Sequence, residues 1–377
     1  MITEKSVNND GELEVSIVMP CLNEEQTVGI CVRKAVETLQ KLGVKGEVVI
    51  ADNGSTDKSV EIATSLGARV VHQPLKGYGN AYFMGFTEAR GKYIIMADSD
   101  DSYDLTHLEP FIQALREGNE LVMGSRFRGE IKPGAMPFLH RFLGNPVLTR
   151  ILNFLYGTRI SDAHSGMRAF TKDAFERMHL RTEGMEFASE MVIKAAKAKL
   201  KIGEIPITLW PDGRTGKPHL RSFRDGWRHL RFMLMYDPRH LFSFPGVGLQ
   251  LLGFILLIAY LTDSLTFQYG ALGGVVVLAG WVVQRFGFYA RTHQFTDEFP
   301  DWDLPLQKFF KRFSLEKSLI GGVVRTVIGV GILALSFSFD PFYSRRLFLM
   351  GILIIAFGIM TIFDAFLTRI LQFVGLK

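Results

Sequence analysis

Four long apolar segments in the last third of the chain constrain its fold most. Residues 241–261 and 264–284 carry no charged side chain, and residues 319–339 carry only Arg325. A fourth apolar run covers residues 347–367. Each segment is close to the ~20 residues that a helix needs to cross a bilayer. The sequence therefore predicts four transmembrane helices, in a transmembrane domain at residues 241–377.

The positive charges between these segments predict their orientation. The link at residues 285–317 is rich in Lys and Arg, whereas the link at 262–263 has neither. Because positively charged loops are retained in the cytoplasm, we expect this basic link and the N-terminal domain to be cytoplasmic. Arg345 and Arg346, in the other short loop, oppose this assignment weakly. The predicted localisation is a multi-pass membrane protein with its N-terminal domain in the cytoplasm.

The N-terminal half alternates short apolar runs with helical patterns. Strands are predicted at residues 15–19, 47–51, 69–72, 93–97, 120–123 and near 202–207. Helices are predicted near 26–42, 57–66, 79–90, 105–117, 138–157, 170–178 and 185–199. Such repetition is typical of an α/β fold with a doubly wound, mostly parallel sheet. Ligands of such sheets bind at the carboxyl ends of the strands.

Composition sets the remaining boundaries. Residues 1–14 are polar and acidic and are predicted to be a disordered tail, followed by the α/β domain at 15–218. Residues 219–240 are predicted to form a juxtamembrane amphipathic helix. Arginines share one of its faces and apolar side chains the opposite one: Arg221, Arg224, Arg228 and Arg231 against Phe223, Trp227, Leu230 and Leu234. This pattern suits a helix in the membrane interface. A surface helix packed on its own domain is the alternative.

Charge and cysteine usage narrow the class of protein. The net charge of +5 is modest, but Arg and Lys concentrate near residues 214–240, which favours a membrane surface or a phosphate partner over nucleic acid. The chain has two cysteines, Cys21 and Cys31, so a disulfide framework is improbable and a reducing compartment fits. Glycine-rich stretches in the apolar segments, such as 270–280, predict close helix packing and a homo-oligomer.

The pair of carboxylates in Asp98-Ser99-Asp100 follows the apolar run 93–97 directly. A buried strand therefore delivers two hard oxygen ligands into the crevice at the sheet edge. Such ligands suit Mg²⁺ or Mn²⁺ that also holds a diphosphate. The sequence predicts a metal site on Asp98 and Asp100.

Two earlier strand ends carry polar turn residues that suit a nucleoside. The first strand runs into Pro20-Cys21-Leu22-Asn23-Glu24, and the second into Asp52-Asn53-Gly54-Ser55. Asp52 has the chemistry to accept a hydrogen bond from a base or ribose. Helix capping and turn formation explain residues 53–57 equally well.

An ordered set of motifs resembles the family 2 glycosyltransferases with a GT-A fold, in particular the polyprenyl-phosphate (dolichyl-phosphate) hexosyltransferases. The motifs are Pro20-x-x-Asn23-Glu24, Asp52-x-Gly54-Ser55, Lys76-Gly77-x-Gly79, Asp98-x-Asp100, Gly124-Ser125-Arg126 and Asp162-x-x-Ser165-Gly166-x-Arg168. Each motif alone is weak, but the order is specific. The resemblance covers residues 15–240. The transmembrane helices predicted at 241–377 are of the kind that these enzymes also have.

The resemblance implies roles for individual residues. The nucleotide-sugar set is Pro20, Asn23, Glu24, Asp52, Asn53, Lys76, Gly77, Asp98 and Ser99. The metal set is Asp98 and Asp100. Arg126 and Arg168 are expected to contact phosphate groups. Residues 214–219 are expected to form a basic loop that closes over the donor.

Chemical reasoning extends this assignment. A lipid phosphate has its second pKa near ~6, so it is largely a dianion at neutral pH and needs no general base. Cations are needed instead to bring two phosphate-bearing substrates together. The candidates for diphosphate and acceptor contacts are Arg126, Arg141, Arg168, Arg214, Lys217 and His219. Asp162 is open: it orients Arg168 or the sugar, acts as a base for a hydroxyl acceptor, or caps a helix. The predicted catalytic residues are Asp100, Asp162 and Arg126.

The predicted reaction is inverting, metal-dependent transfer of a hexose from a UDP-glucose or GDP-mannose type donor to polyprenyl phosphate at the cytoplasmic face. Two departures from the family pattern are present: Ser102 replaces a frequent Gln, and the basic loop is one residue shorter. Alternatives are transfer to a glycolipid or polysaccharide and a non-catalytic membrane scaffold. A processive synthase is disfavoured because residues 224–228 lack its Gln/Arg-x-x-Arg-Trp motif.

Overall fold

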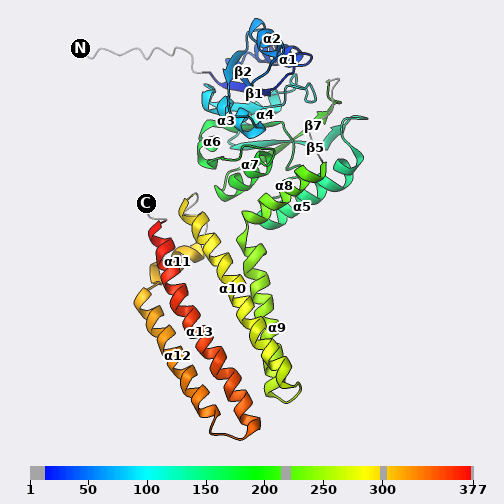
Figure 1. Ribbon diagram of the computed structural model, residues 1–377. Coiled ribbons are helices and arrows are strands. Elements are labelled where there is room, and N and C mark those ends of the chain that lie inside the picture. The colour runs from blue at the N-terminus through cyan, green and yellow to red at the C-terminus, as the bar shows by residue number, and fades with distance from the viewer. Residues whose placement is uncertain (1–12, 214–221, 298–303, 375–377) are drawn as a thin grey trace, which may run out of the picture. The chain divides into compact units, whose positions relative to one another are not determined.

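The computed structural model describes residues 13–213, 222–297 and 304–374 (Figure 1). The chain forms two compact units that divide between Met233 and Leu234. The first unit, up to Met233, contains the sheet and is called the catalytic unit below. The second, from Leu234, contains the apolar helices and is called the membrane unit. Most of the predicted tail lies outside the described residues. We therefore treat the two units separately.

The sheet of the first unit has seven strands in the order β3-β2-β1-β4-β6-β5-β7. They are β1 (Val15–Cys21), β2 (Gly46–Asp52), β3 (Arg69–His72), β4 (Tyr93–Met96), β5 (Leu121–Ile131), β6 (Arg168–Thr171) and β7 (Ile202–Leu209). β6 is antiparallel to both neighbours, whereas the other pairs are parallel. The prediction of a mostly parallel α/β sheet is confirmed.

Helices lie between the strands in the order expected for a doubly wound fold. They are α1 (Val28–Lys41), α2 (Ser59–Ser65), α3 (Tyr78–Glu88), α4 (Glu109–Arg116), η1 (His140–Gly144), α5 (Asn145–Tyr156), α6 (Lys172–Met178), α7 (Phe187–Lys197) and α8 (Ser222–Met235). η1 is a short π-helical turn that runs directly into α5.

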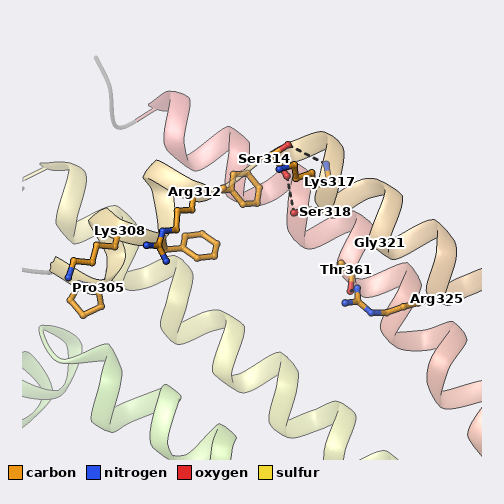
Figure 2. A pocket seen from close by; sticks show the side chains of 11 residues that line it. Pro305, Lys308, Arg312, Ser314, Lys317, Ser318, Gly321, Arg325 and Thr361 are labelled. Carbon is orange, nitrogen blue, oxygen red and sulfur yellow. Dashed lines mark hydrogen bonds between the residues drawn. The ribbon is translucent and has the colours of Figure 1, made fainter.

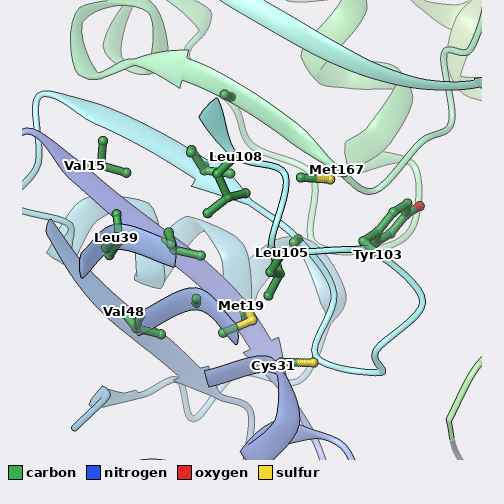
Figure 3. Close-up of a cluster of buried hydrophobic side chains, with 14 of the residues drawn as sticks. Val15, Met19, Cys31, Leu39, Val48, Tyr103, Leu105, Leu108 and Met167 are labelled. Carbon is green, nitrogen blue, oxygen red and sulfur yellow. The ribbon is translucent and has the colours of Figure 1, made fainter. Parts of the chain in front are cut away.

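The core of this unit has two layers because side chains alternate along each strand. On one face Val15, Ile17 and Met19 of β1 pack with α1 and α4 (Figure 3). On the other face Val18 packs so close to α3 that a Cβ on Gly85 would lie 2.4 Å from it. Each fully buried side chain of this size stabilises the fold by about 1.5–3 kcal/mol. The two layers hold the carboxyl ends of β1, β2 and β4 at one rigid edge.

One strand was missed because its sequence is short and borders a helix. The prediction of a helix over residues 170–178 is wrong at its start, since residues 168–171 form β6. Ala169 pairs with Ile95 of β4 on one side and with Val122 of β5 on the other. Four residues carry too little periodicity to reveal this, so tertiary pairing decides the conformation. Thr171 then caps α6 by accepting a hydrogen bond from the N–H of Ala174 (3.0 Å).

The described part of α8 packs on its own unit by a narrow face. His229 and Met233 are buried, whereas Trp227 is 59% exposed. These buried residues lie between the basic and aromatic faces that the sequence suggested. Of the described residues on the aromatic side, Trp227 is exposed and Leu230 and Leu234 are half-buried.

The second unit contains four helices that are long and apolar enough to cross a membrane, as predicted. The candidate spans are Arg239–Leu261, Phe267–His293, Leu315–Ser336 and Pro341–Leu371. They belong to η2 (Arg239–Ser243) with α9 (Phe244–Leu261), to α10 (Phe267–Asp297), to α12 (Leu315–Ser336) and to α13 (Pro341–Val374). The short helix α11 (Leu304–Arg312), in the basic link, was not predicted.

Glycines set the packing of these helices in pairs. A Cβ on Gly253 of α9 would lie 2.6 Å from the carbonyl oxygen of Gly273 in α10. A Cβ on Gly322 of α12 would lie 2.9 Å from the carbonyl oxygen of Gly358 in α13. The predicted close packing is confirmed within the chain. The homo-oligomer stays a prediction.

Candidate active site

A cavity of about 790 Å³ opens at the carboxyl edge of the sheet. The following predicted residues line it: Pro20, Glu24, Asn53, Lys76, Gly77, Asp98, Ser99, Asp100 and Arg126. They come from the ends of β1, β2 and β4, from the segment before α3, and from β5. The fold thus brings together residues that lie up to 106 positions apart in the sequence.

The carboxylate of Asp98 is held by two phenols. Its Oδ1 accepts hydrogen bonds from the hydroxyls of Tyr78 (2.9 Å) and Tyr82 (3.2 Å). Burial and the nearby charge of Asp98 raise the pKa of both tyrosines well above the usual value, so both remain donors. A Cβ on Gly166 would lie 2.4 Å from Oδ2 of Asp98, so only glycine leaves room beside that oxygen.

Asp100 is oriented by the turn that follows it. Its Oδ1 accepts hydrogen bonds from the N–H (3.1 Å) and hydroxyl (2.6 Å) of Ser102. Between the two acids, the hydroxyl of Ser99 donates to the carbonyl oxygen of Pro20 (2.6 Å). This contact fastens the end of β4 to the end of β1. Ser102, which departs from the Gln of the family pattern, therefore positions a carboxylate.

The two acids fit a divalent cation bound together with a diphosphate. Both are half-buried and both line the cavity. Among the described residues, there is no cluster of three or more His, Cys, Asp or Glu side chains arranged as a metal site. Mg²⁺ is commonly held by one or two carboxylates plus substrate phosphates. Asp98 and Asp100 therefore have the ligand chemistry of such a site.

Arg126 and Asp162 form a buried bidentate ion pair. Nε of Arg126 donates to Oδ2 of Asp162 (2.6 Å), and Nη2 donates to Oδ1 (2.8 Å). The main-chain N–H of Arg126 adds a third bond (3.1 Å). Burial alone would lower the pKa of Arg126, but the carboxylate of Asp162 outweighs it and the pKa is raised. Asp162 thus orients Arg126, and it does not itself line the cavity.

Arg168 and Arg141 lie away from the cavity lining. Arg168 is 0% exposed and donates to the carbonyl oxygens of Ser165, Ala188 and Ala163 at 2.9–3.0 Å. It ties three segments together, which is a structural role. Arg141 in η1 is exposed, and its guanidinium lies 5.5 Å from the centre of the Phe142 ring. Phosphate contacts by these two arginines remain predictions that their placement does not favour.

Asn53, one of the predicted nucleotide-sugar residues, organises one edge of the cavity. Its side-chain amide donates to the carbonyl oxygens of Gln73 (3.0 Å) and Leu75 (2.7 Å) and accepts from the N–H of Gly77 (2.8 Å). Lys76 donates to the carbonyl oxygen of Asn53 (2.6 Å). Gly77 has φ +144°, a conformation that side chains rarely adopt. The loop before α3 is therefore locked against the end of β2.

Asp52 and Asn23 support this edge from behind and do not line the cavity. Asp52 accepts from the N–H of Ser55 (2.9 Å) and lies 3.1 Å from Nδ1 of His72. Asn23 has φ +58° and accepts from the N–H of Thr56 (2.8 Å). Both side chains form turn hydrogen bonds here, and the nucleotide-binding roles of Asp52 and Asn23 stay predictions.

The cavity also holds aromatic and imidazole side chains that the sequence reasoning did not assign: Tyr78, Tyr103, His164 and His229. The hydroxyl of Tyr103 accepts from the N–H of Gly166 (2.8 Å), and burial raises its pKa to about 12. His164 and His229 both contact the hydroxyl of Ser189 (3.3 and 2.8 Å). Tyr78 stood inside the Lys76-Gly77-x-Gly79 motif, so its position was a usable signal.

Three predicted residues, Arg214, Lys217 and His219, lie outside the described residues. Their roles stay predictions. Asp212, which is described, lines the cavity.

Comparisons with known proteins agree on the class of the chain. The family model for Glycosyl transferase family 2 matches residues 16–178. The low-salt glycan biosynthesis hexosyltransferase of Haloferax volcanii is 39% identical, and the match covers 96% of this chain and 90% of the relative. The dolichyl-phosphate hexose transferase of the same organism is 30% identical, covering 56% of this chain and 89% of the relative.

A solved structure shows the same fold. The glucosyl-3-phosphoglycerate synthase of Mycobacterium tuberculosis, in complex with Mn²⁺, UDP-glucose and phosphoglyceric acid, superposes with a TM-score of 0.50. It is 19% identical, and the match covers 60% of this chain and 80% of that one. At this identity the likeness concerns the fold alone. Together with the relative that matches along nearly its whole length, these findings show that the chain is a glycosyltransferase of family 2 with a GT-A fold.

Proposed function

We propose that this enzyme transfers a hexose from a nucleotide sugar to a polyprenyl phosphate, with inversion at the anomeric carbon. The observation that carries the proposal is that Asp98 and Asp100 line the same cavity as Asn53 and Gly77. Four candidate membrane spans follow this catalytic unit in one chain, as a lipid acceptor would require. The relative named as a dolichyl-phosphate hexose transferase supports the acceptor class.

The donor is proposed to lie with its nucleoside against Asn53 and Gly77 and its diphosphate toward Asp98 and Asp100. A divalent cation on these two acids would neutralise negative charge on the departing diphosphate. A structural relative of the same fold was crystallised with Mn²⁺. The hydroxyls of Tyr78 and Tyr82 hold the carboxylate of Asp98 in place by hydrogen bonds. Because both hydroxyls are neutral, they leave the negative charge of Asp98 available to the cation.

The acceptor phosphate oxygen would attack the anomeric carbon from the side opposite the diphosphate. The new oxygen–carbon bond forms as the bond to the diphosphate breaks, and the diphosphate leaves with the electron pair. A phosphate dianion needs no base for this step. Asp162 already accepts three N–H groups from Arg126, which suits an orienting role better than proton transfer.

Chain order supports a single membrane face for the polar ends of the spans. Four successive crossings would place the start of α9, the link between α10 and α12 and the end of α13 on the same side. The catalytic unit enters α9 at that side. The Lys and Arg residues of the 285–317 link favour the cytoplasm for it.

Transfer from a panel of radiolabelled nucleotide sugars to undecaprenyl or dolichyl phosphate tests the proposal. The purified full chain is assayed with Mn²⁺ or Mg²⁺, with EDTA, and as the Asp100→Asn variant. Label is expected in the lipid fraction with one donor and metal, and is expected to disappear with EDTA or in the variant. Label that passes only to a glycolipid hydroxyl, or to no acceptor at all, would overturn the proposed acceptor.

A further inference from the structure

A second cavity, of about 700 Å³, lies entirely within the membrane unit (Figure 2). It is formed by α11, by the start of α12 and by Thr361 of α13. Four basic side chains line it and no acidic one does: Lys308, Arg312, Lys317 and Arg325. The catalytic proposal makes no use of this cavity, which lies in a different unit of the chain.

The positive charge of this cavity is uncompensated in the described part of the chain. Lys308, Arg312 and Lys317 form no ion pair with any described acidic side chain. The neighbouring acid, Glu316, accepts a hydrogen bond from Ser314 (2.8 Å) and does not line the cavity. Several unpaired cations around one space repel one another, so an anion would stabilise the arrangement.

The cavity extends into the membrane span of α12. Arg325 lies ten residues after Leu315, a rise of about 15 Å along a helix. Its Nη1 donates to the hydroxyl of Thr361 (3.4 Å) in the span of α13. Helical side chains lean toward the N-terminus, so the guanidinium points back to Gly321 and the cavity. An arginine at this depth is costly unless it faces a polar site.

Apolar groups share the lining with the cations. Phe309 and Phe313 contact the cavity, and their rings stack with centroids 5.6 Å apart. Figure 2 shows Lys308 at one end of the cavity and Arg325 at the other, with Arg312 and Lys317 between them. A ligand that fills this space meets phosphate-binding groups and apolar surface together. That combination fits an amphiphile better than a free ion.

We infer that this cavity binds the phosphate headgroup of a membrane lipid. Arg312 and Lys317 contact the phosphate, Arg325 draws the headgroup toward the bilayer, and the phenylalanines contact the first part of the lipid chain. The inference is independent of the proposed transfer reaction, because binding here needs neither a donor sugar nor the residues of the catalytic cavity.

Retention of two matched lipids by the purified full chain tests this. Phosphatidic acid and diacylglycerol with identical acyl chains differ only in the phosphate, and native mass spectrometry counts the bound copies of each. Wild type is expected to retain phosphatidic acid in preference. Arg312→Gln and Lys317→Gln are each expected to weaken that retention about fivefold, since one basic residue near a membrane contributes about that much.

A matched control lies on the same helix. Lys311→Gln removes the same charge from α11 at an exposed residue outside the cavity lining, and is expected to leave retention unchanged. Arg325→Lys, which keeps the charge, is expected to retain more lipid than Arg325→Gln. Unfolding temperatures of all variants are compared with wild type, and Arg325→Lys keeps the test valid if Arg325→Gln does not fold.

Three results would overturn the inference. Equal retention of the two lipids would exclude phosphate recognition. An effect of Lys311→Gln as large as that of Arg312→Gln would show attraction by overall charge. Full displacement of phosphatidic acid by an equal concentration of inorganic phosphate would show that the cavity takes the free ion. Failure of sugar transfer affects none of these readouts, so the two proposals fail separately.

Discussion

The cavity of the catalytic unit and the basic cavity of the membrane unit differ in the charges that line them. Four acidic residues line the cavity in the catalytic unit, Glu24, Asp98, Asp100 and Asp212, and its buried arginine, Arg126, is paired with Asp162. The cavity in the membrane unit presents four cations and no acid. In the proposed reaction a metal ion lies between Asp98, Asp100 and the diphosphate, whereas the proposed lipid phosphate meets the cations of the second cavity directly. An ion that comes with the donor and leaves with the product suits turnover, and fixed cations suit retention.

Removing one acid from the catalytic cavity is expected to have the largest effect, and it tests whether transfer depends on a metal site there. Asp100→Asn is expected to lower the rate of metal-dependent transfer by about 10²–10³, because charge on the leaving diphosphate is then poorly stabilised. Asp101→Asn is the matched control, since Asp101 bonds Lys34 (2.7 Å) and does not line the cavity. Initial rates at saturating donor measure both. Equal losses in the two variants would show that overall charge matters and not the position of Asp100.

The buried Arg126–Asp162 pair offers the next largest effect, on stability. Asp162→Asn leaves a charged guanidinium buried beside a neutral amide, and is expected to destabilise the catalytic unit by about 3–5 kcal/mol. Thermal unfolding of the full chain, followed with a probe in the catalytic unit, measures the loss.

A double variant separates stability from catalysis at this pair. Arg126→Met with Asp162→Leu removes both charges and is expected to recover most of the lost stability, since apolar replacements of buried pairs are tolerated. Transfer is expected to remain impaired, because Arg126 lines the cavity. Full recovery of transfer in the double variant would contradict any role of Arg126 with the substrates.

The sequence predicts the catalytic cavity better than the basic cavity, for physical reasons. The catalytic cavity was largely foreseen, because parallel strands end at one edge and place Asp98, Asp100 and Asn53 together whatever the loops do. The Arg126–Asp162 pair was not, since the two residues meet only through the pairing of β5 with β6. The membrane spans follow from length and composition alone. The basic cavity needs the turn between α11 and α12, which no short motif encodes.

Salt sharpens the contrast between the two cavities. Raising NaCl from 50 to 500 mM is expected to weaken retention of phosphatidic acid by the basic cavity about three- to tenfold, because screening acts on partly exposed cations. Binding of the nucleotide sugar with its metal is expected to change less, because hydrogen bonds and metal coordination in a half-buried site are screened less. Titration of each ligand at the two salt concentrations measures both. A larger loss for the nucleotide sugar would reverse the comparison.

The smallest expected effect concerns His164, a neutral group in the catalytic cavity. Burial, with the nearby charges of His229, Arg126 and Arg168, holds the pKa of His164 well below its usual value of 6.5. Because the unfolded chain binds this proton more readily than the folded one, the contribution of His164 is fully present above pH 6.5 and is lost progressively as the pH falls below it. His164→Asn lacks the titrating ring. The unfolding temperature of wild type is therefore expected to fall more than that of the variant between pH 7.5 and 5.5, by a difference equivalent to about 1 kcal/mol. Parallel curves for the two proteins over this range would show that His164 takes up its proton in the folded enzyme as easily as in the unfolded chain.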